Sequence, residues 1–322
     1  MRQTATILAL LLYAAVPAFA QDRATLPLVV MLRVNTASTV EPMETSFRNA
    51  LAALGQVDGR NIRLESRLAE GQLERLPDLA RSLVNENPAV IVAVGEAPAR
   101  AAQQATTTVP IVTLADDIVE SGFITTLAKP GGNITGISIL GIELDAKKID
   151  LLKQILPTAR RIGVLRDPST SGPARMQAII EMAKALGVEL QIVDIHSPDD
   201  IAAAFTSFEA GGAEAIDVLA SPLLFSLRKE LGRLSLAHKL PAICQFRENV
   251  DAGCLASYGI SLPRAYLLLA DLTDKVLRGV KPADLPAQQP TRVELVVSQQ
   301  AARAMGIEIP QSILQRADEV IE

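Results

Sequence analysis

The sequence has 322 residues and a formal net charge of −5, and 49% of its residues are hydrophobic. This length suits two domains, because a single domain commonly holds about 100–200 residues. The acidic balance and the lack of a basic run exclude the charge pattern of a nucleic-acid-binding protein.

The first twenty residues, MRQTATILALLLYAAVPAFA, are expected to form a secretory signal peptide. They combine a positive charge at Arg2, an apolar run from Ile7 to Val16 and an Ala-Phe-Ala cleavage sequence ending at Ala20. The apolar run is shorter than the ~20 residues of a membrane-spanning helix. We therefore predict export to the periplasm and a mature chain that begins near Gln21, with an uncleaved anchor as the alternative.

Apolar, β-branched runs alternate with amphipathic helical stretches, a pattern that predicts parallel sheets with helices on both faces. The first strand is expected at 28–34, followed by a helix that Ser38 or Thr39 caps and Gly55 ends. The apolar face of this helix holds Met43, Phe47, Ala50, Leu51 and Leu54. Further helices are expected at 73–84, 118–127, 174–186, 198–210 and 262–278, and further strands at 89–94, 109–114, 134–140, 161–165, 188–194, 215–219, 240–245 and 292–297.

The stretch PGGNITGIS at 130–138 is similar to a phosphate-binding loop, but Ile137 stands where that motif requires Lys. A phosphate-binding loop follows a strand and opens a helix, whereas this stretch is expected to end a helix and begin a strand. We therefore interpret its glycines as helix-stop and turn residues rather than as a nucleotide site.

Two cysteines, Cys244 and Cys254, would lie in an oxidising compartment after export. Their spacing permits one disulfide, but they fall in different predicted elements. Two buried free thiols are therefore the favoured state, and the disulfide is the alternative.

Five stretches extend over almost the whole mature chain: AEGQLERLPDLARSLV at 69–84, KPGGNITGIS at 129–138, LASYG at 255–259, GVKPADLPAQQPTRVELVVS at 279–298 and ILQRADEVIE at 313–322. Together they resemble the periplasmic solute-binding proteins of ABC transporters with the type I fold. Some members of this branch bind amino acids, including aromatic ones.

The resemblance implies two Rossmann-like α/β lobes with parallel sheets, joined by three hinge segments near 132–138, 252–257 and 282–291. The N-terminal lobe is then expected at 21–137 plus 258–280, and the C-terminal lobe at 138–257 plus 281–322. Such a protein captures a small solute between the lobes and delivers it to an ABC permease and ATPase in the inner membrane. It is expected to act as a monomer without a cofactor. A sensing module that signals to a membrane receptor is the alternative function.

Ligands of open α/β sheets bind at the carboxyl ends of the strands. In the first lobe these positions hold Asn35, Thr36, Ser38, Glu96 and Asp116. In the second lobe they hold Arg166, Asp167, Ser221, Arg247 and Tyr258. We expect these ten residues to contact the solute, and Arg166 and Glu96 depart from the residues that are usual in the family.

The two halves repeat one pattern of strand, turn, helix, strand and charged turn, which places Asp116 and Arg247 at equivalent strand ends. An amino-acid ligand offers an ammonium for the aspartate and a carboxylate for the arginine. Arg33 is unusual because an arginine in an apolar strand is costly unless it is paired or faces a polar cavity. It is expected either to reach solvent from the strand end or to bind a ligand carboxylate.

The sequence lacks the short motifs of common hydrolases, metalloproteases and dinucleotide-binding enzymes. Its two histidines, His196 and His238, fall at the ends of predicted elements, where structural roles are more common than catalytic ones. We therefore predict a binding protein rather than an enzyme, with no metal site.

Overall fold

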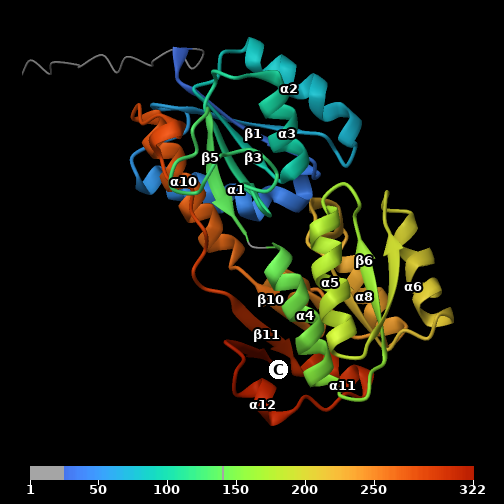
Figure 1. The fold of residues 1–322 in the computed structure, drawn as a ribbon. Helices are drawn as coiled ribbons and strands as arrows, with labels where there is room; N and C mark the ends of the chain where they lie inside the picture. Colours follow the sequence, from blue (N-terminus) through green and yellow to red (C-terminus); the bar gives the residue numbers. More distant parts are fainter. Residues whose placement is uncertain (1–24, 140) are drawn as a thin grey trace, which may run out of the picture.

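The computed structural model describes residues 25–139 and 141–322, so the predicted signal peptide lies outside the described residues. The side chains of residues 38, 40 and 142 are also not described. The chain forms two α/β lobes that stand one above the other in Figure 1, and each is built on its own sheet.

The first lobe contains a five-stranded parallel sheet in the order β2-β1-β3-β4-β5. Its central strands are apolar on both faces, as expected of a parallel sheet covered by helices on each side. The edge strand β2 was not predicted, because its sequence RLESRL lacks an apolar run. The five strands are β1 (Leu28–Arg33), β2 (Arg63–Leu68), β3 (Val90–Val94), β4 (Ile111–Ala115) and β5 (Ile134–Ser138).

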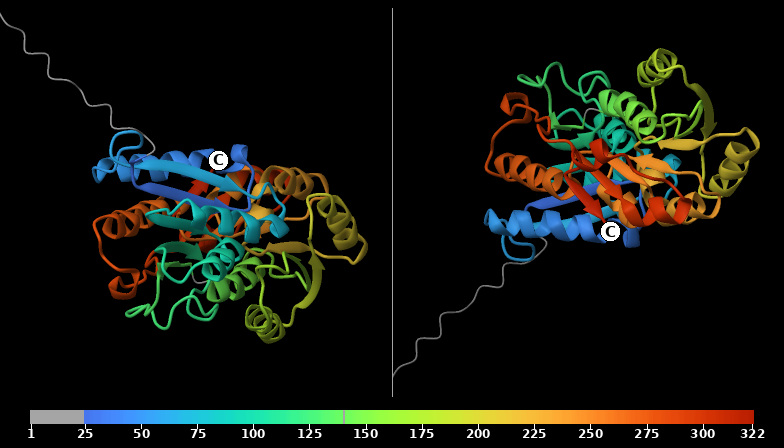
Figure 2. Two further views of the ribbon diagram at one scale, coloured as in Figure 1. Left: turned by 90° about the horizontal axis from the view of Figure 1, so that it is seen from above. Right: turned by 90° about the horizontal axis from the view of Figure 1, so that it is seen from below.

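Helices cover both faces of this sheet, as the views of Figure 2 also show. α1 (Ala37–Ala53) and α10 (Leu262–Leu277) pack together on one face. α2 (Leu76–Asn85), preceded by the short 3-10 helix η2 (Leu73–Arg75), and α3 (Glu96–Ala105) pack on the other. The helix expected at 262–278 therefore belongs to the first lobe.

The second lobe contains a seven-stranded sheet in the order β12-β11-β10-β9-β8-β6-β7, in which only the pair β10–β11 is antiparallel within the described residues. The strands are β6 (Arg161–Arg166), β7 (Glu189–Asp194), β8 (Ala215–Val218), β9 (Ala242–Cys244), β10 (Ala256–Gly259), β11 (Glu294–Ser298) and β12 (Glu319–Ile321). Around them lie α4 (Gly141–Ile155), α5 (Pro173–Ala185), α6 (Asp200–Ala210), α7 (Pro222–Ser226), α8 (Arg228–Ala237), α9 (Arg247–Asp251), α11 (Gln299–Met305) and α12 (Gln311–Leu314).

Within the described residues the chain passes between the lobes after β5, after β10 and again in the segment 285–294. We expected crossings near 132–138 and 252–257, but β5 and β10 each complete their own sheet before the chain crosses. The third crossing is tied to β5, because the Gln288 carbonyl accepts from Ser138 N and the Gln288 N–H donates to Gly136 O, both at 2.9 Å. Just before it, the 3-10 helix η3 (Pro282–Asp284) contacts β5.

One predicted helix is absent. Residues 118–127 form turns, because the Asp117 carboxylate accepts the Val119 and Glu120 N–H groups and Gly122 adopts a φ of +70°. Gly136 in the glycine-rich stretch has a packing role, since a Cβ there would lie 2.1 Å from the Thr113 carbonyl oxygen. The interpretation of this stretch as a turn that leads into a strand agrees with β5.

The two cysteines lie side by side in the second lobe. Both are buried free thiols, and their Sγ atoms are 2.7 Å apart. Burial raises the pKa of the Cys244 thiol, so it is protonated at neutral pH. No described helix is both long enough and apolar enough to cross a bilayer.

Candidate functional site

A cleft that is partly open to solvent lies between the lobes at the carboxyl ends of their strands. The first lobe contributes the ends of β1, β3 and β4 and the start of α1. The second lobe contributes the residues that follow β6, β8 and β9. Most of the wall is apolar and is formed by Met43, Val94, Leu114, Ile139, Phe225, Phe246 and Leu262.

The described residues of the two lobes touch across this cleft at several points. The Asn35 side chain donates to the Pro222 carbonyl at 2.8 Å. Gly95, with a φ of +103°, brings its backbone so close that a Cβ would lie 3.1 Å from Pro222 Cγ. Asp116 of the first lobe forms an ion pair with Arg175 of the second. The cleft is therefore closed over by residues of both lobes.

Arg33 ends β1 at one side of the cleft and is only 2% exposed. Its Nη2 donates to the Tyr266 hydroxyl at 2.6 Å, and its guanidinium carbon lies 5.2 Å from the centre of that ring. Its Nε is buried and has no hydrogen-bond partner, and no carboxylate among the described residues pairs with it. Arg33 is thus buried rather than solvent-reaching, and it forms no ion pair with a described carboxylate.

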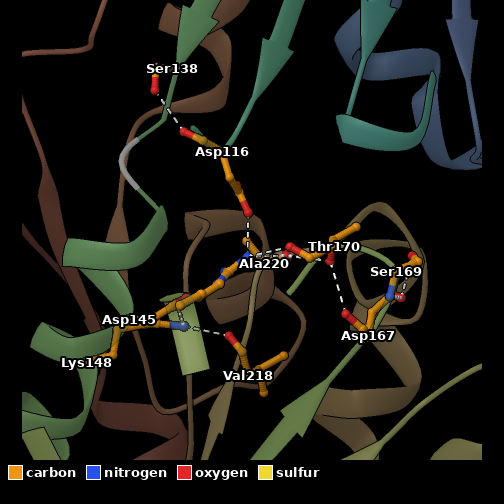
Figure 3. A network of polar contacts seen from close by, with 10 residues as sticks. Asp116, Ser138, Asp145, Lys148, Asp167, Ser169, Thr170, Val218 and Ala220 are labelled. Carbon is orange, nitrogen blue, oxygen red and sulfur yellow. Dashed lines mark hydrogen bonds and ion pairs between the residues drawn. The ribbon is translucent and has the colours of Figure 1, made fainter. Parts of the chain in front are cut away.

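A chain of buried charges lies at the other side, and Figure 3 shows it extending from Asp116 to Asp145 and Lys148. Arg175 bridges Asp116 and Asp145. Lys148 lies 2.8 Å from both Asp145 and Asp217 and donates to the Val218 carbonyl at 2.6 Å. When all three carboxyls are ionised, the two cations neutralise two of them and one negative charge remains in excess.

The pKa values of the three carboxyls in this chain of charges are shifted in different directions. Burial raises the pKa of Asp116 to about 6, although Arg175 opposes the rise. Burial also raises the pKa of Asp217 to about 6. Burial acts on Asp145 as well, but Arg175 and Lys148 outweigh it and lower the pKa of that carboxyl. Of the two carboxylates with raised pKa, Asp217 is fully buried and Asp116 faces the cleft.

Comparison with known proteins identifies the family. The family model described as ABC transporter substrate binding protein matches residues 30–321, which is nearly the whole described chain. The chain belongs to this family. Over 273 residues it is 26% identical to the tyrosine-binding protein of Clostridioides difficile (strain R20291), and the match covers 84% of this chain and 78% of that protein.

Two solved structures are similar to this substrate-binding protein along most of its length. One is a conserved domain protein from Vibrio cholerae, with a TM-score of 0.84, 26% identity and coverage of 91% of this chain and 99% of that one. The other is a domain from Streptococcus pneumonia in complex with L-Trp, with a TM-score of 0.84, 23% identity and coverage of 92% and 100%. The fold is that of a type I periplasmic binding protein.

Four of the predicted ligand-binding residues line the cleft of this substrate-binding protein: Asn35, Glu96, Asp116 and Ser221. The Ser221 hydroxyl is already engaged, because it accepts from Leu224 N at 2.9 Å and caps α7. The Glu96 carboxylate lies 3.4 Å from Arg100. Asp116 differs from these, since its Oδ2 binds Arg175 while its Oδ1 accepts no hydrogen bond from the described residues.

Thr36 precedes α1, and its Oγ1 lies 3.1 Å from the hydroxyl of Thr39. Thr39 lines the cleft, whereas Thr36 does not. Ser38 lies in α1, where its side chain is not described.

The other four predicted residues do not line this cleft, although Asp167 lines an adjacent cavity between the lobes. Arg166 binds Asp194 of the neighbouring strand through two hydrogen bonds of 2.7 and 2.6 Å. Asp167 accepts the Ser169 N–H and hydroxyl in a local turn. Tyr258 packs on the core of the second lobe, because alternation along β10 points its side chain to that face.

Arg247 begins α9, and the expected meeting of Arg247 with Asp116 across the cleft is not seen. Its guanidinium is 2.7 Å from both carboxylate oxygens of Glu319 on β12 and also pairs with Asp251. β9 ends with Cys244, and the chain turns into α9 three residues later, so the side chain faces the sheet edge. The repeated pattern of the two halves therefore did not extend to side-chain direction.

Sequence reasoning missed Tyr266 and Arg175, which hold Arg33 and Asp116 in place. Tyr266 gave no separate signal, because it lies among the apolar residues on the buried face of a long helix. Arg175 did carry a signal, because it lies four residues before the buried Ile179 on the apolar face of α5. A charged residue at such a position requires a buried partner.

Proposed function

We propose that this protein captures an amino acid with a large apolar or aromatic side chain between its lobes and delivers it to an ABC permease and ATPase. In this proposal the chain is exported through its N-terminal segment and acts as a monomer in the periplasm. The family supports the role in transport, and the charges of the cleft support the choice of ligand.

The observation that carries the proposal is a pair of opposite, unbalanced charges facing one apolar cleft. The buried Arg33 guanidinium has no acidic partner among the described residues, and the chain of charges that ends at Asp116 has one carboxylate in excess. A zwitterion would compensate both, with its carboxylate at Arg33 and its ammonium at Asp116.

Sheet geometry brings these two groups to a distance that suits one amino acid. Arg33 and Asp116 follow the same face of the sheet, and only β3 separates β1 from β4. Two strand spacings amount to about 10 Å, which a long arginine side chain and one amino acid together can bridge.

The apolar wall between the charges would hold the ligand side chain. Phe225 and Phe246 stand edge to face with ring centres 5.6 Å apart. A relative is described as a tyrosine-binding protein, and one similar structure holds L-Trp. We therefore propose that large apolar or aromatic amino acids fit this cleft best.

Thermal unfolding of the purified mature protein with L-tyrosine, tyramine and 3-(4-hydroxyphenyl)propionate tests the proposal. The three compounds share a side chain, but tyramine lacks the carboxylate and the propionate lacks the ammonium. A ligand at 100 times its Kd adds about 2.7 kcal/mol to stability. We expect a clear shift with L-tyrosine or another apolar L-amino acid and much smaller shifts with the two analogues.

Two variants serve as the matched pair for this test. Asp116→Ala is expected to weaken amino-acid binding about tenfold to a hundredfold, because a charge-assisted hydrogen bond is lost. Arg247→Ala is expected to leave the affinity unchanged, since its guanidinium is held by Glu319 and Asp251. No shift with any L-amino acid, or equal shifts with L-tyrosine and tyramine, would contradict the zwitterion proposal.

A further inference from the structure

The Asp116–Arg175 contact is the only ion pair among the described residues that joins the two lobes. Asp116 follows β4 of the first lobe, and Arg175 lies in the first turn of α5 in the second. The pair lies at the edge of the ligand cleft, because Asp116 lines both the cleft and an adjoining chamber that Arg175 also lines.

Arg175 is held firmly by its own lobe. It is 3% exposed, its Nε donates to Asp145, and its Nη1 lies 3.4 Å from the carbonyls of Thr170 and Ala220. Asp145 is held in turn by Lys148. The guanidinium of Arg175 is therefore fixed to the second lobe and moves with it.

Asp116 is held with equal firmness at the point where the chain leaves the first lobe. Its carbonyl accepts the Ser138 hydroxyl at 2.9 Å (Figure 3). It also accepts the Ile139 N–H at 3.0 Å, and both residues lie at the end of β5. Gly141, the first residue of α4, leaves room for the carboxylate, because a Cβ there would lie 2.9 Å from Asp116 Cγ. Opening of the lobes about this crossing must therefore separate Asp116 from Arg175.

We infer that Arg175 is a positioning residue that holds the Asp116 carboxylate across the closed cleft, so that a cationic group of the ligand and closure of the lobes stabilise each other. This inference rests on the proposed function. Arg175 occupies Oδ2 of Asp116 and leaves Oδ1 for the ligand ammonium. The ammonium then neutralises the one excess carboxylate of the chain, which makes the closed arrangement more stable with the ligand than without it.

The charged groups around Asp116 agree with this coupling. They are Glu96 on α3, Asp145 and Lys148 on α4, and Arg175 on α5. Burial in the closed cleft raises the pKa of Asp116 to about 6, so an unsatisfied carboxylate there is costly. A ligand without a positive charge would leave that cost in place.

The test combines affinity with closure. We expect Arg175→Met to weaken binding of L-tyrosine, used as the probe, by about tenfold or more in calorimetry. We also expect small-angle X-ray scattering of the variant without ligand to show a larger radius of gyration than the wild type. Arg166→Met is the matched control, because Arg166 pairs with Asp194 inside the second lobe. It is expected to change neither quantity.

A double-mutant cycle with Asp116→Asn separates coupling from general damage. The affinity losses of Asp116→Asn and Arg175→Met are expected to be strongly non-additive, since either change breaks the same contact. If Arg175→Met does not fold, Arg175→Lys keeps the charge and serves in the same cycle. Additive losses, or unchanged affinity together with an unchanged radius of gyration, would overturn the inference. If the wild type binds no zwitterion, the proposed function is wrong. The scattering comparison then still decides whether the Asp116–Arg175 pair holds the lobes together.

Discussion

Arg33 shows at the scale of one residue how a binding site can oppose folding. A guanidinium that is 2% exposed and has no acidic partner among the described residues destabilises the folded chain. We expect Arg33→Met to raise the free energy of unfolding by about 1 kcal/mol or more while it weakens amino-acid binding about tenfold to a hundredfold. Urea unfolding and calorimetry measure the two effects. A variant that loses stability and keeps its affinity would show that Arg33 has only a structural role.

Helix α4 illustrates the element scale, because Asp145 and Lys148 lie on the same stripe as Leu152 and Ile155. Asp145 contacts both cations of the chain of charges, whereas Asp217 contacts only Lys148. We expect Asp145→Asn to cost more stability than Asp217→Asn, because it removes a charge-assisted contact from each of two buried cations, and such contacts contribute about 1.5–3 kcal/mol each. Asp217→Asn removes such a contact from Lys148 alone. Equal losses in urea unfolding would contradict this account of the network.

At the scale of the whole molecule, pH is expected to move affinity and stability in opposite directions. The folded-state pKa values of Asp116 and Asp217 are raised to about 6, so both carboxyls bind protons more tightly when folded than when unfolded. Their contribution to stability is therefore complete below the unfolded value near 4 and is lost as pH rises through about 6. Affinity for an amino acid should instead fall as pH drops through about 6, because protonated Asp116 no longer attracts the ammonium.

Calorimetry and thermal unfolding between about pH 5 and pH 7.5 check both directions. The matched control is Asp116→Asn, whose already weakened affinity should be nearly independent of pH over this range. A wild-type affinity that is constant across the range would exclude Asp116 as the group that binds the ammonium.

Much of the fold could be predicted from local patterns. The apolar runs of β1, β3, β4 and β6 and the helices between them follow from period and composition, which act over a few residues. The edge strand β2 escaped prediction because its polar sequence lacks such a period. The turns at 118–127 were mistaken for a helix, because the side-chain capping by Asp117 overrides an apolar pattern.

The sequence by itself determined the family, the two-lobed class and the strand ends that hold Asp116, Asn35, Glu96 and Ser221. Only the tertiary structure decided which charges meet. Arg33 donates a hydrogen bond to Tyr266, which lies 233 residues later in the chain, and Arg175 rather than Arg247 pairs with Asp116. The reason is that strand and helix periods depend on neighbours in sequence. The partner of a buried charge, in contrast, depends on how separate elements and lobes pack, which no local pattern records.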